Sequence, residues 1–144
     1  VYKEDIQLVH VTSTRMLMQA GFMARLFDVL GRNKVVIGMI ATSEVTVSLT
    51  TDTVAGLPQA VDEITRENVA RVKVETGKAV MCVVGRGMRH SIGTAARVFS
   101  AVSKAGVNIQ MISQGASEIN ISFVVNNEDI PKTVQALHEE LFGK

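Results

Sequence analysis

Two spacings of apolar residues alternate along the chain, a period of two and the wider period of a helix. Positions 45–49 read VTVSL, so apolar and polar residues alternate and predict a strand with one buried face. Read over residues 6–75, the spacings predict the order strand, helix, strand, strand, helix, strand, and Thr76-Gly77 is predicted to turn the chain. The first helical stripe consists of Phe22, Leu26, Phe27 and Leu30.

The same order of elements then starts again. The segment 79–84 (AVMCVV) is apolar throughout, as expected of a strand that is covered on both sides. Two helical stripes follow, one on each side of an alternating segment at 119–123. This second series ends without a closing strand, so its sheet is predicted to have an open edge, filled by residues upstream of Val1 or partly by Val1 and Tyr2.

A direct sequence repeat underlies the two series. ARLFDVLGRNKVVIGMI, from Ala24, aligns without gaps to ARVFSAVSKAGVNIQMI, from Ala96. After two extra residues in the second copy, SEVTVSL from Ser43 matches SEINISF from Ser117. Each copy therefore reads as a βαββαβ unit of ferredoxin-like type.

We predict an α+β protein made of two such units in tandem. The first is expected over residues 6–76 and the second over residues 77–144. The second unit lacks one strand in this sequence and is expected to be completed by residues upstream of, or around, positions 1–5.

Composition limits the classes of function. Apolar residues make up 47% of the 144 residues against 20% charged, so the chain can build a core. The net charge of +1 and the scattered basic residues give no footprint for nucleic acid or for an anionic membrane surface. With 4% aromatic residues, the sheet also lacks the stacking platform of an RNA-binding domain. No apolar stretch approaches the roughly 20 residues of a membrane span.

Motifs for catalysis and metal binding are missing from the sequence. Cys82 is the single cysteine and is expected to pack in the core of a protein from a reducing, cytoplasmic compartment. The histidines show no metal-ligand spacing, and no Ser/His/Asp arrangement follows from a motif. The segment 85–93 (GRGMRHSIG) fails the spacing of a dinucleotide-binding loop. We therefore expect no catalytic residue, no metal and no cofactor in this chain.

Polar residues beside a helix start favour a binding site instead. A loop leads into a helix at Gly21 and Phe22, where backbone N–H groups favour a carboxylate and the glycine permits close approach. On the neighbouring strand, Thr42, Ser43 and Glu44 offer oxygen atoms to an ammonium group. An α-amino acid carries both charges and suits this arrangement. The alternative is that these polar residues only end strands and cap helices.

Several segments resemble the regulatory C-terminal region of aspartate kinases: STRML from Ser13, GF at Gly21, MIATSEV from Met39, GVNIQMISQGASEINISF from Gly106 and ALHEELF from Ala136. The resemblance covers nearly the whole chain, and SQGASEINIS is highly specific for that family. It implies a tandem pair of ACT domains, amino-acid-binding modules that inhibit the kinase when lysine or threonine accumulates. It also implies an upstream kinase domain that uses ATP and Mg to phosphorylate the aspartate carboxylate, and a homodimer formed by ACT–ACT pairing.

The resemblance carries over a set of effector contacts. In lysine-inhibited relatives the effector sits at an ACT–ACT interface between two chains. In this chain the contacts are expected from the loop, the helix start and the neighbouring strand: Met16, Gln19, Gly21, Phe22, Met23, Val36, Ile37, Gly38, Thr42, Ser43 and Glu44. A second site, or part of the interface, is expected from Asn108, Ile109, Gln110, Ser113 and Gln114.

Position 38 departs from the family pattern. Lysine-inhibited relatives usually read VDMIATSEV, and this chain reads IGMIATSEV, with Gly38 in place of an aspartate that pairs with an ammonium of lysine. Leaving a buried charge unpaired costs several kcal/mol, so the change bears directly on lysine binding. Either Glu44 replaces the missing carboxylate, or threonine is the effector, or the enzyme is insensitive to both.

The sequence favours the effector-binding part of an aspartate kinase, in which the amino acid binds one arrangement of paired ACT units more tightly and so inhibits the enzyme. A stand-alone tandem ACT sensor that acts on a separate partner is the alternative. An independent enzyme on the same scaffold would need paired catalytic groups in one cleft, and the sequence shows none.

Overall fold

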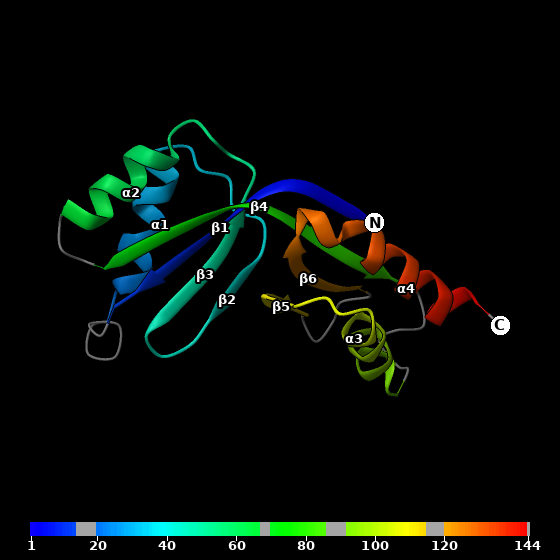
Figure 1. The fold of residues 1–144 in the computed structure, drawn as a ribbon. Helices are drawn as coiled ribbons and strands as arrows, with labels where there is room; N and C mark the ends of the chain where they lie inside the picture. The colour runs from blue at the N-terminus through cyan, green and yellow to red at the C-terminus, as the bar shows by residue number, and fades with distance from the viewer. Residues whose placement is uncertain (14–19, 67–69, 86–91, 115–119, 144) are drawn as a thin grey trace. The chain divides into compact units, whose positions relative to one another are not determined.

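The computed structural model describes residues 1–13, 20–66, 70–85, 92–114 and 120–143 (Figure 1). The chain divides into two compact units, which we call the first unit (Ile6–Thr76) and the second unit (Val1–Asp5 with Gly77–Lys144). Strands β1 (Tyr2–Thr12) and β4 (Arg71–Val84) contribute residues to both units.

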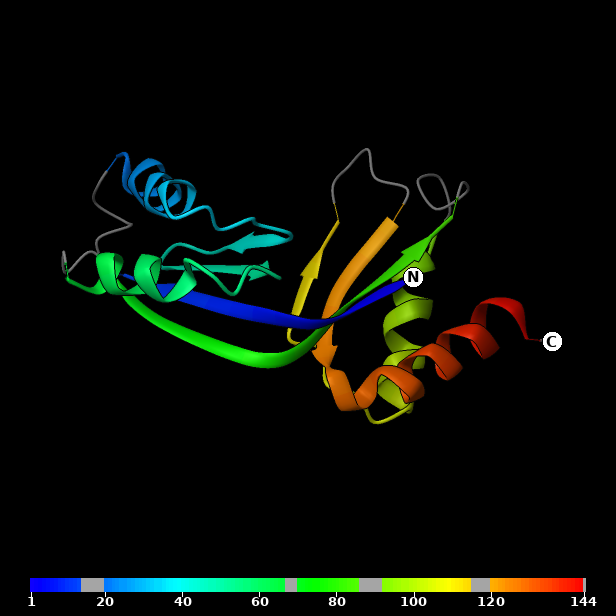
Figure 2. The same ribbon diagram turned by 90° about the horizontal axis from the view of Figure 1, so that it is seen from above.

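The first unit pairs its strands in the order β2-β3-β1-β4 and covers one face of the sheet with helices α1 and α2 (Figures 1 and 2). Alternate residues of β1 and β3 point to the helix side, so Val9, Val11, Val47 and Leu49 join the apolar helix residues in one core. Besides β1 and β4, the elements of this unit are α1 (Phe22–Arg32), β2 (Ile40–Thr42), β3 (Thr46–Thr51) and α2 (Leu57–Arg66).

The second unit pairs its strands in the order β1-β4-β6-β5. Its edge begins at Val1, whose carbonyl accepts the N–H of Cys82 at 2.8 Å. The core is built around Phe123, which is fully buried and meets Phe99 edge to face with ring centroids 5.9 Å apart. The remaining elements are α3 (Thr94–Lys104), β5 (Met111–Ser113), β6 (Asn120–Asn126), the 3₁₀ turn η3 (Asn127–Asp129) and α4 (Ile130–Phe142).

Both units therefore show the ferredoxin-like strand order, and the predicted α+β tandem is confirmed. No helix in the described part of the chain has both the length and the apolar character needed to cross a membrane.

The predicted turn at Thr76-Gly77 is wrong. β4 runs without interruption from Arg71 to Val84, and Gly77 lies inside it with a φ of 69°. A glycine within a strand pattern marks either a local bend or a turn, and only the pairing of the flanking residues distinguishes the two.

The strand predicted between the first helix and the alternating segment is short in the structure, where only Ile40–Thr42 forms β2. The preceding residues are held partly by side-chain hydroxyls: the N–H of Val36 donates to Oγ1 of Thr53 at 3.0 Å, and Oγ1 of Thr51 donates to the carbonyl of Val36. Threonine hydroxyls thus replace part of the backbone ladder here.

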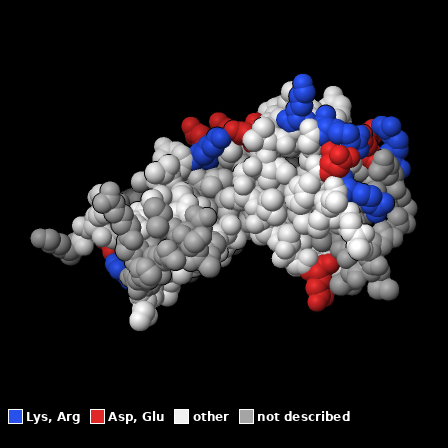
Figure 3. Space-filling view, turned by 180° about the vertical axis from the view of Figure 1, so that it is seen from behind, with Lys and Arg blue, Asp and Glu red and all other residues white. Residues whose placement is uncertain are grey.

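Charged residues of both signs are interspersed on the face of the molecule drawn in Figure 3. Two of the ion pairs join helices within a unit. Arg32 Nη2 lies 2.8 Å from Glu63 Oε2 between α1 and α2, and Arg97 Nε lies 3.0 Å from Glu140 Oε1 between α3 and α4. Their side chains are 29–55% exposed, so each pair stabilises the fold only modestly.

Candidate functional site

The helix side of the predicted site lies at the start of α1. Gly21 is exposed and takes a left-handed backbone with φ 86°, and its carbonyl accepts the first helical N–H, that of Arg25, at 3.0 Å. The ring of Phe22 is only 2% exposed and belongs to the core, while Met23 packs partly against it. What Phe22 and Met23 offer a ligand is therefore the backbone N–H groups of the first turn, which have no acceptor within the helix. Met16 and Gln19 lie outside the described residues.

The strand side is shaped by a bulge opposite Thr50. The N–H of Gly38 donates to the carbonyl of Thr50 at 2.8 Å, and the N–H of Thr50 donates to the carbonyl of Met39 at 3.0 Å. Two residues on one strand thus face a single residue on the other, which is a β-bulge. Gly38 is exposed at this bulge, Val36 beside it is 65% exposed, and Ile37 packs against the core. The bulge presents backbone to solvent in the middle of the predicted wall.

The polar end of this wall is the hairpin between β2 and β3. The N–H of Ser43 donates to the carbonyl of Thr46 at 2.9 Å, and its hydroxyl bonds the Thr46 hydroxyl. Thr42, Ser43 and Glu44 are all exposed. The Ser43 hydroxyl is thus already bonded within the hairpin, whereas Thr42 and Glu44 present oxygens at the surface.

One backbone hydrogen bond links the end of β1 to the hairpin. The N–H of Ser13, at the end of β1, donates to the carbonyl of Val45 at 2.9 Å. The segment between β1 and α1 therefore starts directly beside the β2–β3 hairpin. The first unit offers N–H donors at the start of α1 and an exposed carboxylate and hydroxyl on the hairpin, a set that suits a zwitterion.

The corresponding residues of the second unit are arranged differently. Gln110, which aligns with Gly38, donates its side-chain N–H to Oδ1 of Asn126 at 2.9 Å. Lys78 Nζ donates to the same oxygen at 2.6 Å. Among the other predicted residues, Asn108 and Gln114 are exposed, and Ile109 and Ser113 are partly buried. The side chain at position 110 is thus already bonded within its own unit.

Two features of the first unit were not singled out from the sequence. One is Thr50, whose hydroxyl oxygen accepts the N–H of Met39 at 2.7 Å. The other is a row across three strands: His10 Nδ1 lies 3.2 Å from Ser48 Oγ, and His10 Nε2 lies 2.9 Å from Glu75 Oε2. Polar residues at alternating positions are a signal for such a row, but the register that brings the three together requires the folded sheet.

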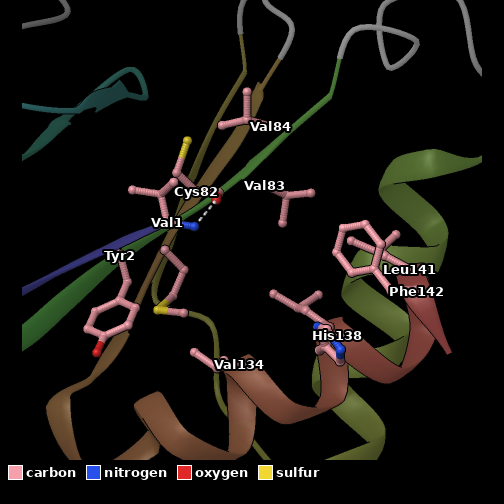
Figure 4. A pocket seen from close by; sticks show the side chains of 11 residues that line it. Val1, Tyr2, Cys82, Val83, Val84, Val134, His138, Leu141 and Phe142 are labelled. Atoms are coloured by element: carbon pink, nitrogen blue, oxygen red, sulfur yellow. Dashed lines mark hydrogen bonds between the residues drawn. The ribbon is translucent and has the colours of Figure 1, made fainter.

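A cavity of about 440 Å³ lies in the second unit, between the start of β1, the end of β4 and helix α4 (Figure 4). Most of the side chains around it are apolar, so it does not suit a charged amino acid. Among the described residues, no group of three His, Cys, Asp or Glu side chains is placed to hold a metal. The residues around the cavity are Val1, Tyr2, Met81, Cys82, Val83, Val84, Val134, Leu137, His138, Leu141 and Phe142.

A family model described as ACT domain matches residues 9–65 and 81–141 of the chain. Among curated proteins, aspartokinase 1, chloroplastic, from Arabidopsis thaliana is 38% identical, over 99% of this chain and 26% of that protein. The aspartokinase of Saccharomyces cerevisiae is 35% identical, over 99% of this chain and 28% of that protein. The chain therefore spans about a quarter of the length of these relatives.

Solved structures of aspartate kinases are also similar to this chain. A C-terminal regulatory domain of aspartate kinase from Porphyromonas gingivalis has a TM-score of 0.85 and 34% identity, covering 99% of this chain and 95% of that one. Aspartokinase III of Escherichia coli, in complex with lysine and aspartate in its T-state, has a TM-score of 0.78 and 33% identity, covering 98% of this chain and 32% of that one.

Proposed function

This chain belongs to the ACT domain family, among the C-terminal regulatory regions of aspartate kinases, and we propose that it senses an amino-acid effector for such an enzyme. The observation that carries the proposal is the match to the Porphyromonas gingivalis regulatory domain, which extends over 99% of this chain and 95% of that domain at 34% identity.

In the proposed complex the effector binds to the first unit. Its carboxylate accepts hydrogen bonds from the N–H groups at the start of α1, and its ammonium group meets the exposed oxygens of Thr42 and Glu44 on the hairpin. Lysine and threonine are the effectors to test first. The complex of Escherichia coli aspartokinase III with lysine supports the first of them.

In the whole protein, a kinase domain upstream transfers phosphate from ATP, with Mg, to the aspartate carboxylate. Effector binding inhibits it because the effector has a higher affinity for one arrangement of the ACT units, and such a coupling is typically about 1–3 kcal/mol. Two chains pair through their ACT units, which covers the exposed edges β2 and β5. The free Cys82 is consistent with a reducing, cytoplasmic location.

Calorimetric titration with lysine, with threonine and with both together tests the proposal. We expect at least one of them to bind, and the variant Glu44→Gln to bind it more weakly. Glu128→Gln, an exposed carboxylate of the second unit, is the matched control and should bind as the wild type does. Absence of binding at millimolar concentration, together with a full-length kinase that neither amino acid inhibits, would refute the proposal.

Sedimentation of the chain tests the pairing separately. A dimer is expected at concentrations on the order of tens of micromolar, where stable interfaces of ordinary size are occupied. A monomer under these conditions would exclude self-association of this region by itself.

A further inference from the structure

Strands β1 and β4 each pass from one unit to the other, and each carries a left-handed residue at the boundary. The first unit begins at Ile6 on β1 and ends at Thr76 on β4. Asp5, directly before that boundary, has a φ of 59°, and Gly77, directly after it, has a φ of 69°. Among the residues that the structure describes, no other strand residue is left-handed. A left-handed residue bends a strand locally, so the course of both strands depends on what holds them at these points.

Asn127, directly after β6, holds Asp5 by a reciprocal pair of hydrogen bonds. Its Nδ2 donates to Oδ1 of Asp5 at 2.8 Å, and its Oδ1 accepts the backbone N–H of Asp5 at 3.2 Å. The second of these bonds fixes the backbone as well as the side chain. Because a left-handed conformation costs an L-residue free energy, it persists where surrounding bonds hold it in place.

Asn126, the last residue of β6, holds the other strand. Lys78, next to Gly77, lies opposite Asn126 in the ladder and donates from Nζ to its Oδ1 at 2.6 Å. The side chain of Gln110 donates to the same oxygen at 2.9 Å, so this oxygen is fixed from two sides. Two consecutive asparagines, which we call the asparagine clasp, thus hold β1 and β4 at or next to their left-handed residues. All of these residues belong to the second unit.

The first copy of the repeat has other residues at these places. Asp52 and Thr53 align with Asn126 and Asn127. The hydroxyl of Thr53 accepts the N–H of Val36 at 3.0 Å, which is a bond inside the first unit. The asparagine clasp therefore belongs to the second copy alone, and the two residues bonded to it, Asp5 and Lys78, lie where β1 and β4 reach the boundary.

We propose that the asparagine clasp couples the two units, so that a change of stability in the first unit changes the stability of the second. Without the clasp, the bends at Asp5 and Gly77 absorb a disturbance of the strands, as hinge positions do. With it, both strands are tied to the end of β6, which lies inside the sheet between β4 and β5. An effector that stabilises the first unit then stabilises the second through the same bonds. This last step rests on the proposed function, and the coupling itself does not.

Amide exchange of the whole chain without ligand tests the coupling. Ile64→Val removes one methyl group from the core of the first unit and should speed exchange there about fivefold. In the wild-type background, exchange in β6 should rise by a similar factor. In the clasp variant, with Asn126→Ala and Asn127→Ala together, Ile64→Val should leave exchange in β6 unchanged. Each comparison is made within one background, so a general loss of stability in the clasp variant does not imitate uncoupling.

Two controls separate the clasp from a general effect of substitution. Asn108→Ala changes an exposed asparagine of the same unit and should keep the response of β6. Asn126→Asp keeps an oxygen that accepts from Lys78 and Gln110 and should also keep it. If the double variant does not fold, Asn127→Ala alone gives the comparison and should at least halve the response. An equal response of β6 with and without the clasp, or no response in the wild type, would overturn the proposal.

Exchange measured with saturating lysine, and separately with threonine, tests the step to the effector. An amino acid that binds the wild type should slow exchange in β6, whereas in the clasp variant it should still bind by calorimetry and leave exchange in β6 unchanged. Equal slowing in both would overturn this step. If neither amino acid binds the wild type, the proposed function fails, and the comparison with Ile64→Val still decides whether the clasp couples the units.

Discussion

The end of α1 carries a backbone conformation that a lysine adopts at a cost. Lys34 is left-handed, with a φ of 60°. Its N–H donates to the carbonyl of Gly31 at 3.0 Å, and the N–H of Val35 reaches the carbonyl of Leu30 at 3.0 Å. These two bonds close the helix in a Schellman motif, which favours glycine at the left-handed position.

The second unit closes α3 in the same way but with glycine at that position. Gly106 has a φ of 78°, its N–H donates to the carbonyl of Ser103 at 3.0 Å, and the N–H of Val107 reaches the carbonyl of Val102 at 3.3 Å. The two copies therefore provide a comparison of lysine and glycine in one backbone setting.

We predict that Lys34→Gly stabilises the chain. The left-handed conformation costs an L-residue roughly 1–2 kcal/mol, and glycine avoids this cost. Glycine loses more conformational entropy on folding, which reduces this gain in stability by about 0.5–1 kcal/mol. The net gain is about 0.5–1 kcal/mol. Since 1 kcal/mol moves the Tm of a domain of 60–100 residues by about 4–8 °C, the expected rise is about 2–8 °C.

Urea unfolding with Lys34→Ala beside Lys34→Gly isolates the backbone contribution. Alanine also removes the lysine charge, which is favourable near the end of a helix, but it keeps the left-handed strain. Gly106→Ala should lower the free energy of unfolding by about as much as Lys34→Gly raises it. The reasoning is refuted if Lys34→Gly is no more stable than Lys34→Ala at an unchanged dependence on urea concentration.

Three further substitutions test the packing of each unit. Gly56→Ala should destabilise the first unit by about 3 kcal/mol or more, because the φ of Gly56 is 87° and a Cβ there would lie 2.2 Å from the carbonyl oxygen of Asn33. Urea unfolding measures this loss of stability, and a loss under about 1 kcal/mol would contradict the prediction. Phe123→Ala should cost about 3–5 kcal/mol, as the ring is fully buried, and a calorimetric Tm within a few degrees of the wild type would contradict this. Asn127→Ala removes the side chain that donates to Asp5 Oδ1 at 2.8 Å and accepts the N–H of the same residue at 3.2 Å. It should lower stability by about 1 kcal/mol, and amide exchange in β1 should be faster; unchanged exchange would show that this pair does not hold the strand.

The repeat allowed much of the fold to be predicted. The helical stripe that starts at Phe22 coincides with the first residue of α1, and the alternating segments coincide with the paired strands β3 and β6. These elements follow from local periodicity, which a sequence displays directly.

The details of the candidate site could not be read in this way. The bulge at Gly38, its hydroxyl partner Thr50 and the bond between Gln110 and Asn126 all depend on which residues face each other across strands. Cross-strand register is set by the whole sheet, so a single sequence names the polar residues but not their partners. Likewise, Phe22 reads as a contact residue from the motif, and only its burial shows that its ring serves the core.

The duplication itself supports placing the ligand in the first unit. Both copies have a left-handed glycine before their first helix, Gly21 and Gly93. They differ at the bulge. At the bulge, the second copy has filled the wall with Gln110, whose amide is already bonded, so a ligand there would first have to displace a hydrogen bond. The first copy leaves exposed backbone at Gly38 and carries the exposed carboxylate of Glu44 on the adjoining hairpin. In the first copy, a ligand at the bulge meets no side chain at position 38 that it would have to displace.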